Sequence, residues 1–283
     1  LGSIYRGLGD SRSPVTVLVY ATVLNIILDP MMIFGVFPFP AMGVAGAAWA
    51  TVASQALSVI LLFIGMNSIG FPVKCTRTCA AEFAAIDGSV VRATMRIGLP
   101  AGAQQALVAF SSMAVARVVN SFGSAVLAAY GAGVRLDQFA LMPSMAISMG
   151  VSAVVGQNIG AGKYERVHEV VRLASLLASG VALVVFIVAT TLPRQLYSLF
   201  TTDREVLAAG VLYLRIVSLS YIPYALMFVA NGMIRGAGDT VPTMLNTLGC
   251  LWFVRVPIAY GLSRLPSLGS SGIWIGVAAG PVA

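Results

Sequence analysis

The sequence predicts an all-α polytopic membrane protein, and three observations support that prediction. Of its 283 residues, 58% are hydrophobic and only 10% are charged, whereas about a quarter of the residues in a soluble domain are charged. The mean hydropathy is +0.91. Apolar stretches of about 20 residues, the length at which a helix spans a bilayer, recur along the whole chain.

Glycine, proline and charged residues separate these stretches into eight expected helices. Pro14 and Pro242 fit the first turns of two of them, because that position needs no backbone N–H. In order, the expected helices span residues 14–37, 43–68, 97–120, 125–155, 168–192, 206–233, 242–263 and 270–283. The last one is shorter than a bilayer requires.

A polar segment divides the chain. Residues 69–96 carry the charged side chains Lys74, Arg77, Glu82, Asp87, Arg92 and Arg96. We expect this segment to be a cytoplasmic linker between two helical bundles, one formed by residues 1–68 and the other by residues 97–283.

The net charge of +7 follows from topology rather than from nucleic-acid binding. When residues 1–13 are placed in the cytoplasm, only Arg194, Arg204 and Arg264 lie on the opposite side. Ten basic residues then lie at cytoplasmic ends, as the positive-inside rule requires: Arg6, Arg12, Lys74, Arg77, Arg92, Arg96, Lys163, Arg166, Arg172 and Arg235. We therefore expect the lipid bilayer, and no nucleic acid, as a partner.

An internal repeat indicates two duplicated halves. Residues 6–11 (RGLGDS) recur as residues 235–240 (RGAGDT), an offset of 229. Pro30 and Pro257 follow at an offset of 227, and Gly43 and Gly269 at 226. We interpret each RGxGD run as a tight turn whose glycines permit positive φ and whose aspartate, or the serine or threonine after it, caps the next helix. Duplicated halves in a membrane protein suggest a substrate path between them.

Asp29 is the strongest candidate for chemistry in the first half. It lies about 15 residues into the expected helix 14–37, where an unpaired carboxylate is costly. Asn25 lies one turn earlier on the same helical face. Pro30 cannot donate to the carbonyl of Ile26 and should kink the helix. The Asp29 carboxylate, the Asn25 side-chain carbonyl and the backbone carbonyls loosened by Pro30 suit either a proton or Na⁺. The alternative is that Asp29 is a structural carboxylate paired with a neighbouring helix.

Several runs resemble the multidrug and toxic compound extrusion (MATE) family over essentially the whole chain. They are RGLGDSRSP (6–14), Asn25 with Leu28-Asp29-Pro30, GVAGAAWATVASQ (43–55), GQNIGAGKYERV (156–167) and GMIRGAGDTVPTM (232–244). The resemblance implies a two-lobe bundle of six plus six helices, of which this chain would begin before the fifth and stop within the twelfth. It also implies that Asn25 and Asp29 match the family's cation-coupling pair.

The second half departs from the NorM-like branch of the family, which uses acids on helices seven and ten. The matching helices here have Gln104 and Gln105, then Tyr221 and Tyr224, but no acid. A DinF-like mechanism through the N-terminal lobe is therefore expected. These four residues, with Arg135 and Asp137, are candidates for lining a substrate cavity, and interhelical structural pairing is the alternative for Arg135 and Asp137.

The function that we expect is secondary active export. Small organic, cationic substrates would leave in exchange for H⁺ or Na⁺ by rocker-switch alternating access, in a monomeric transporter of the bacterial inner membrane. The alternative is a flippase for lipid-linked precursors or polysaccharides. A membrane-embedded transferase is disfavoured, because one histidine and one clear mid-membrane acid offer no nucleophile–base pair. We expect no enzymatic activity, no cofactor and no metal other than Na⁺ at Asp29.

Overall fold

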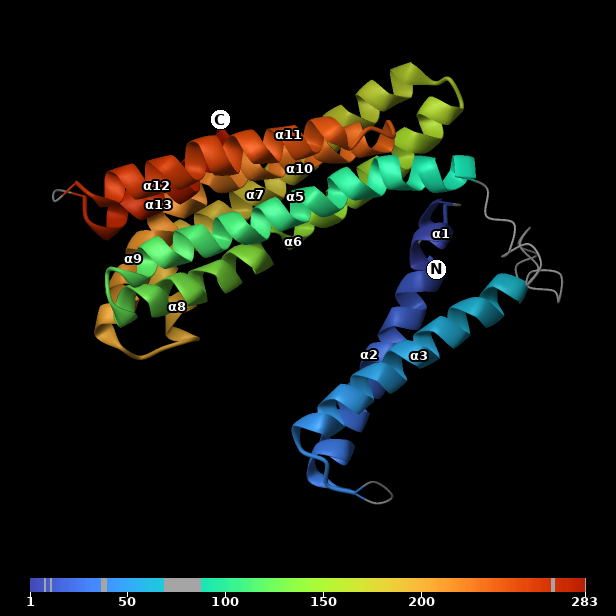
Figure 1. Cartoon of the computed structure of the whole chain (residues 1–283), viewed down its shortest axis with the longest axis horizontal. Coiled ribbons are helices and arrows are strands. Elements are labelled where there is room, and N and C mark those ends of the chain that lie inside the picture. Colours follow the sequence, from blue (N-terminus) through green and yellow to red (C-terminus); the bar gives the residue numbers. More distant parts are fainter. Residues whose placement is uncertain (8, 11, 37–39, 69–87, 266–267, 283) are drawn as a thin grey trace. The chain divides into compact units, whose positions relative to one another are not determined.

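The chain is helical and divides into two units (Figure 1). A computed structural model describes residues 1–7, 9–10, 12–36, 40–68, 88–265 and 268–282. The first unit is Leu1–Asp87 and the second is Gly88–Ala283. No strand occurs among these described residues, so the all-α prediction is confirmed. Of the expected linker, residues 69–87 lie outside the described ranges, and residues 88–96 are already helical.

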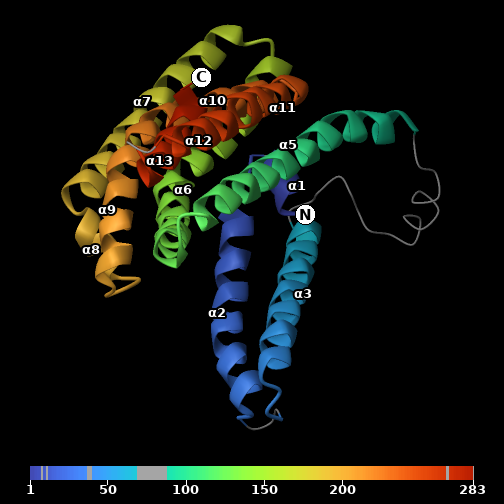
Figure 2. The same ribbon diagram turned by 60° about the vertical axis from the view of Figure 1, so that its left-hand side comes forward.

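The first unit is a pair of long helices preceded by a short one. Helix α1 (Gly2–Gly7) leads into α2 (Arg12–Phe34), which packs against α3 (Val44–Ser68). Both views show α2 and α3 side by side (Figures 1 and 2). Tyr5 of α1 is 1% exposed and its hydroxyl donates a 2.8 Å hydrogen bond to the carbonyl of Leu62. This contact fixes α1 against the end of α3.

The second unit is a helical bundle (Figure 2). Its long helices pack in a continuous network: α6 contacts α7, α9 and α10, while α12 packs on α13. A core of aromatic and aliphatic side chains includes Tyr130, Tyr213 and Trp274. In chain order the elements are α5 (Gly88–Asn120), α6 (Ser124–Gly160), α7 (Tyr164–Thr191), α8 (Pro193–Ser198), α9 (Arg204–Val217), η1 (Ser218–Ser220), α10 (Tyr221–Gly236), α11 (Val241–Leu248), η2 (Gly249–Arg255), α12 (Val256–Ser263), α13 (Ser270–Ala279) and η3 (Gly280–Val282).

The helices are long enough for a polytopic membrane protein. Within the described ranges, six helical stretches can cross a membrane by length and composition. They are Arg12–Phe34, Val44–Gly65, Ser124–Gly160, Tyr164–Thr191, Arg204–Gly236 and Val241–Ser263. The expected helix 242–263 contains a feature that the sequence pattern did not predict, because residues 249–255 (η2) form a π-helix of seven residues.

The internal repeat is visible in the backbone. Gly9 and Gly238 both have positive φ, at 88° and 83°. The amide of Asp10 donates to the carbonyl of Tyr5, and the amide of Asp239, at the equivalent place, donates to the carbonyl of Ile234. Gly43 and Gly269, which precede the second helix of each pair, also share positive φ, at 56° and 50°. At these described positions, the two RGxGD turns therefore share their hydrogen bonding and glycine conformation.

The aspartate of each turn caps the following helix, as expected. Asp10 accepts hydrogen bonds from the amides of Arg12 and Ser13 and from the Ser13 hydroxyl. The Ser13 hydroxyl bond and then the backbone bonds lower the pKa of the Asp10 carboxyl, so the cap stays ionised at neutral pH. Asp239 accepts from the amide of Val241.

A close approach between α2 and α3 generates the first prediction. A Cβ on Gly46 would overlap the carbonyl of Met32 and the amide of Ile33. Because backbone cannot move aside cheaply, Gly46→Ala should destabilise the protein by about 2 kcal/mol, measured by thermal unfolding in detergent. Gly102→Ala is the matched control, since its Cβ would meet nothing within 4 Å in α5. Equal stability of the two variants would show that the two helices do not approach this closely.

Candidate functional site

The expected pair on α2 forms within one helical turn. The Asn25 Nδ2 atom donates a 3.3 Å hydrogen bond to Asp29 Oδ1, and both side chains are half-buried. Helix α2 continues through Pro30 to Phe34. Because Pro30 has no N–H, the carbonyl of Ile26 receives no bond from it. A carboxylate, an amide oxygen and this carbonyl therefore belong to one short stretch of helix.

In the second unit, Asp137 of α6 is held by two tyrosines. The Tyr221 hydroxyl donates a 2.7 Å hydrogen bond to Asp137 Oδ1, and the Tyr213 hydroxyl donates to Oδ2. Both tyrosines are buried, at 2% and 0% exposure. Gly133, one turn before Asp137, makes room for this arrangement, because a Cβ there would overlap the Tyr213 ring and the Tyr197 hydroxyl. A small residue on α6 thus allows α9 to approach the carboxylate.

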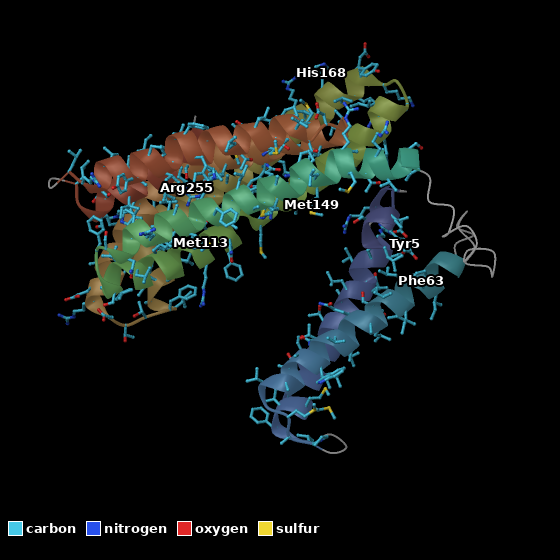
Figure 3. All side chains as sticks on the ribbon, in the orientation of Figure 1. Tyr5, Phe63, Met113, Met149, His168 and Arg255 are labelled. Atoms are coloured by element: carbon cyan, nitrogen blue, oxygen red, sulfur yellow. The ribbon has the colours of Figure 1, made fainter. Side chains whose placement is uncertain are left out.

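Arg255 is a buried basic residue of the second unit. It is 9% exposed and ends the π-helical segment η2; Figure 3 labels it. Trp274 of α13 stacks on Tyr130 at 6.0 Å between ring centroids and meets the Tyr213 ring edge-on at 4.9 Å. Because Tyr213 also donates to Asp137, the carboxylate borders an aromatic cluster.

Gln104 connects three segments of the second unit. Its Nε2 atom donates to the Thr247 hydroxyl at 2.7 Å and to the Thr243 carbonyl at 3.2 Å. Its Oε1 atom accepts a 2.8 Å hydrogen bond from Arg235, the arginine of the second RGxGD turn. Thr240, in the same turn, donates to the carbonyl of Ile97. This network joins α5 to the turn between α10 and α11.

The structure divides the six expected cavity residues among four environments. Gln104 is buried in the network just described. Asp137 and Tyr221 belong to the hydrogen-bonded cluster, whereas Tyr224 stacks on Phe228 of its own helix. Gln105 and Arg135 are exposed. Arg135 is exposed whereas Asp137 bonds two tyrosines, because residues two positions apart on a helix point to different faces.

Sequence reasoning missed Tyr213, which completes the Asp137 cluster. Tyr213 lies 76 positions away from Asp137, and no local pattern connects them.

A cavity of about 260 Å³ adjoins the cluster. It is lined by apolar residues of α6, α7, α8 and α9 and by Tyr221, which also contacts Asp137. In the described part of the chain, no group of three or more His, Cys, Asp or Glu side chains could hold a metal ion.

Two adjacent glutamines provide the second prediction. Gln104→Ala should destabilise the second unit by about 2 kcal/mol, because it removes the hydrogen bonds that Gln104 makes with Thr243, Thr247 and Arg235. Gln105→Ala should change stability by less than about 0.5 kcal/mol, since that side chain is exposed. Thermal unfolding of both variants in detergent tests the difference. Equal effects would contradict the network.

The comparisons with known proteins agree with this architecture. The MatE family model matches residues 100–261. The chain is 31% identical over 271 residues to "Probable multidrug resistance protein YoeA" of Bacillus subtilis, covering 96% of this chain and 58% of that protein. It is 30% identical to "Probable multidrug resistance protein NorM" of Thermotoga maritima, covering 98% and 59%. A crystal structure of the Vibrio cholerae MATE transporter VcmN matches with a TM-score of 0.89 at 25% identity, covering 99% of this chain and 61% of that one.

The chain thus spans about three fifths of the length of these relatives. The family model covers more than half of the chain, and the relatives cover nearly all of it. With its spanning helices, the chain is a multi-pass integral membrane protein of the bacterial inner membrane. It belongs to the MatE family, the multidrug and toxic compound extrusion proteins.

Proposed function

We propose that the whole protein containing this chain is a secondary active exporter that exchanges small organic cations for H⁺ or Na⁺. The relatives named as multidrug resistance proteins support drug or toxin export. The observation that carries the coupling is the Asn25–Asp29 hydrogen bond within a membrane-spanning helix. In this proposal the transporter is monomeric and catalyses no covalent reaction.

The coupling follows from the cost of a carboxylate within the membrane. An ionised Asp29 in a spanning helix is unfavourable, and binding H⁺ or Na⁺ neutralises it. Asn25 accounts for one hydrogen bond to Asp29, and its carbonyl oxygen remains able to accept or to ligate. Binding of H⁺ or Na⁺ therefore changes the charge of this site. The ion shifts the populations of two conformations of the transporter only if it binds one of them more tightly than the other.

Pro30 provides a place for the helix to respond. Because the Ile26 carbonyl lacks a bond from Pro30, α2 can bend there with fewer hydrogen bonds to break. In the proposed cycle, an external cation binds Asp29, α2 bends and the organic cation leaves. Release of the cation inward resets the helix. The two halves rock to alternate access to the substrate path.

The hydrogen bonding of Asp137 in the second unit supports a DinF-like mechanism in which the cation exchanges at Asp29. There, both oxygens of Asp137 already accept hydrogen bonds from tyrosines. Asp29 instead has a single amide donor among the residues described in its unit. The more weakly satisfied carboxylate is the better candidate for exchange.

The third prediction concerns ion-driven efflux. In proteoliposomes containing the whole protein, an imposed pH gradient or Na⁺ gradient should drive export of the cationic dye ethidium. Asp29→Asn should reduce that rate by at least about tenfold, because the neutral side chain no longer exchanges a cation. Glu169→Gln, which neutralises an exposed carboxylate of α7, is the control and should remain within about twofold of wild type.

The gradient that drives export identifies the ion. Unchanged export by Asp29→Asn would contradict the proposed role of Asp29. Failure of both gradients to drive wild-type export would overturn the antiport mechanism. Assays of fluorescent lipid translocation in the same vesicles would then test the flippase alternative.

A further inference from the structure

The cavity beside Tyr221 is a groove with an exposed mouth and a buried base. At the mouth, Phe139 of α6 and Val184 of α7 are 67% and 61% exposed. At the base, Leu214 of α9 and Tyr221 of α10 are 1% and 2% exposed. All four residues belong to stretches that can cross a membrane. This α6–α7 groove therefore leads from the side of the second unit into its core.

The mouth of the groove continues an apolar stripe along α7. The exposed side chains of α7 between Leu173 and Val188 are all apolar, and they recur with the spacing of one helical face. The stripe is about 22 Å long at 1.5 Å per residue, which is most of the thickness of a bilayer's hydrocarbon core. A face of this kind is suited to contact with lipid chains. Its members are Leu173, Leu176, Leu177, Leu183, Val184, Ile187 and Val188.

The groove lies at the end of α7 that is farthest from the turn joining it to α6. From Tyr164, where α7 begins, to Val188 the helix rises by about 36 Å. Helix α8, which contributes Leu196 to the groove, lies at the end of the bundle opposite to that turn (Figure 1). The positive-inside orientation expected from the sequence puts this end in the outer leaflet.

The chemistry of the groove fits a hydrocarbon chain. None of the residues that line it is charged, and all are aliphatic except Phe139 and Tyr221. The Tyr221 hydroxyl already donates its proton to Asp137. Pockets for drug-sized ligands usually measure about 300–1,000 Å³, whereas this groove measures about 260 Å³. A narrow alkyl chain needs neither a polar partner nor the width that a polycyclic cation requires.

We propose that the α6–α7 groove binds one acyl chain of an outer-leaflet phospholipid. Groove walls without a neighbour lose their dispersion contacts, and the bilayer supplies acyl chains directly at the mouth. The bound chain packs against the ring of Tyr221, the residue that joins α10 to Asp137 of α6. A lipid thereby completes the packing around this carboxylate. The inference goes beyond the proposed function and does not depend on which substrate or ion is transported.

The test uses a phospholipid that marks the residues it contacts. The whole protein is reconstituted in phosphatidylcholine vesicles that contain a phosphatidylcholine with a photoactivatable diazirine in one acyl chain. After irradiation, mass spectrometry of the peptides locates the cross-links. Residues 173–177 serve as the internal control for residues 184–188. The two segments lie at equal distances from the middle of the apolar stripe, so probes in the two leaflets reach them at matching depths.

We expect cross-linking at residues 136–140 and 184–188 to exceed that at 173–177 by at least about fivefold, because a groove surrounds a chain that an open face touches on one side. Ala140→Phe should remove this excess, since the added ring occupies the groove that Ala140 lines. Leu177→Phe, which adds a ring to the stripe outside the groove, should keep the excess within about twofold of wild type.

A second pair of variants covers the case in which Ala140→Phe does not fold. Val184→Gln places an amide at the mouth, where it disfavours a hydrocarbon chain. Leu177→Gln is its control, because Leu177 and Val184 are 60% and 61% exposed on the same helix. The first variant should lose the excess of cross-linking and the second should retain it.

Three results would overturn the proposal. Equal cross-linking of the groove and of residues 173–177 would show ordinary bilayer contact only. An excess that persists in both groove variants would place the bound chain elsewhere. Loss of the excess on adding ethidium, while residues 173–177 remain labelled, would assign the groove to the exported cation. Because labelling needs no ion gradient, failure of ion-driven efflux would leave this result unaffected.

Discussion

Inside a bilayer no water is available to hydrogen-bond a polar side chain, so a partner within the protein strongly stabilises a polar group of a spanning helix. Three small hydroxyl residues of the first unit find such a partner locally. Thr22, Thr51 and Ser54 each donate to the carbonyl one turn earlier in their own helix. Gln104 needs several partners, and its network consequently holds α5 against the turn that begins α11.

Carboxylates are the most demanding groups under this constraint, and the two units satisfy them differently. Asp137 has a phenol hydroxyl on each oxygen. Asp29 has an amide from its own helix. The tyrosine bonds to Asp137 come from α9 and α10, so that carboxylate joins three helices of the second unit. The Asn25–Asp29 bond lies within α2 and joins no second helix.

Local features were predictable because their interactions are local. The RGxGD turns close hydrogen bonds within six residues, and their glycines adopt the positive φ that the pattern indicates. The Asn25–Asp29 contact follows from the spacing of one helical turn. The long helices could be predicted because each apolar stretch is long enough to span a bilayer. The π-helical segment could not be predicted, because its residues have the same apolar composition as an α-helix.

The sequence by itself therefore determined the membrane class, the helices, the repeat, the caps and the Asn25–Asp29 pair. Only the tertiary structure decided that Gln104 is buried while Gln105 is exposed, and that Tyr213 and Tyr221 converge on Asp137. The physical reason is the range of the interactions. The tyrosines lie 76 and 84 residues from Asp137, so their contact depends on which faces of α6, α9 and α10 pack together, and helical periodicity alone does not specify that choice.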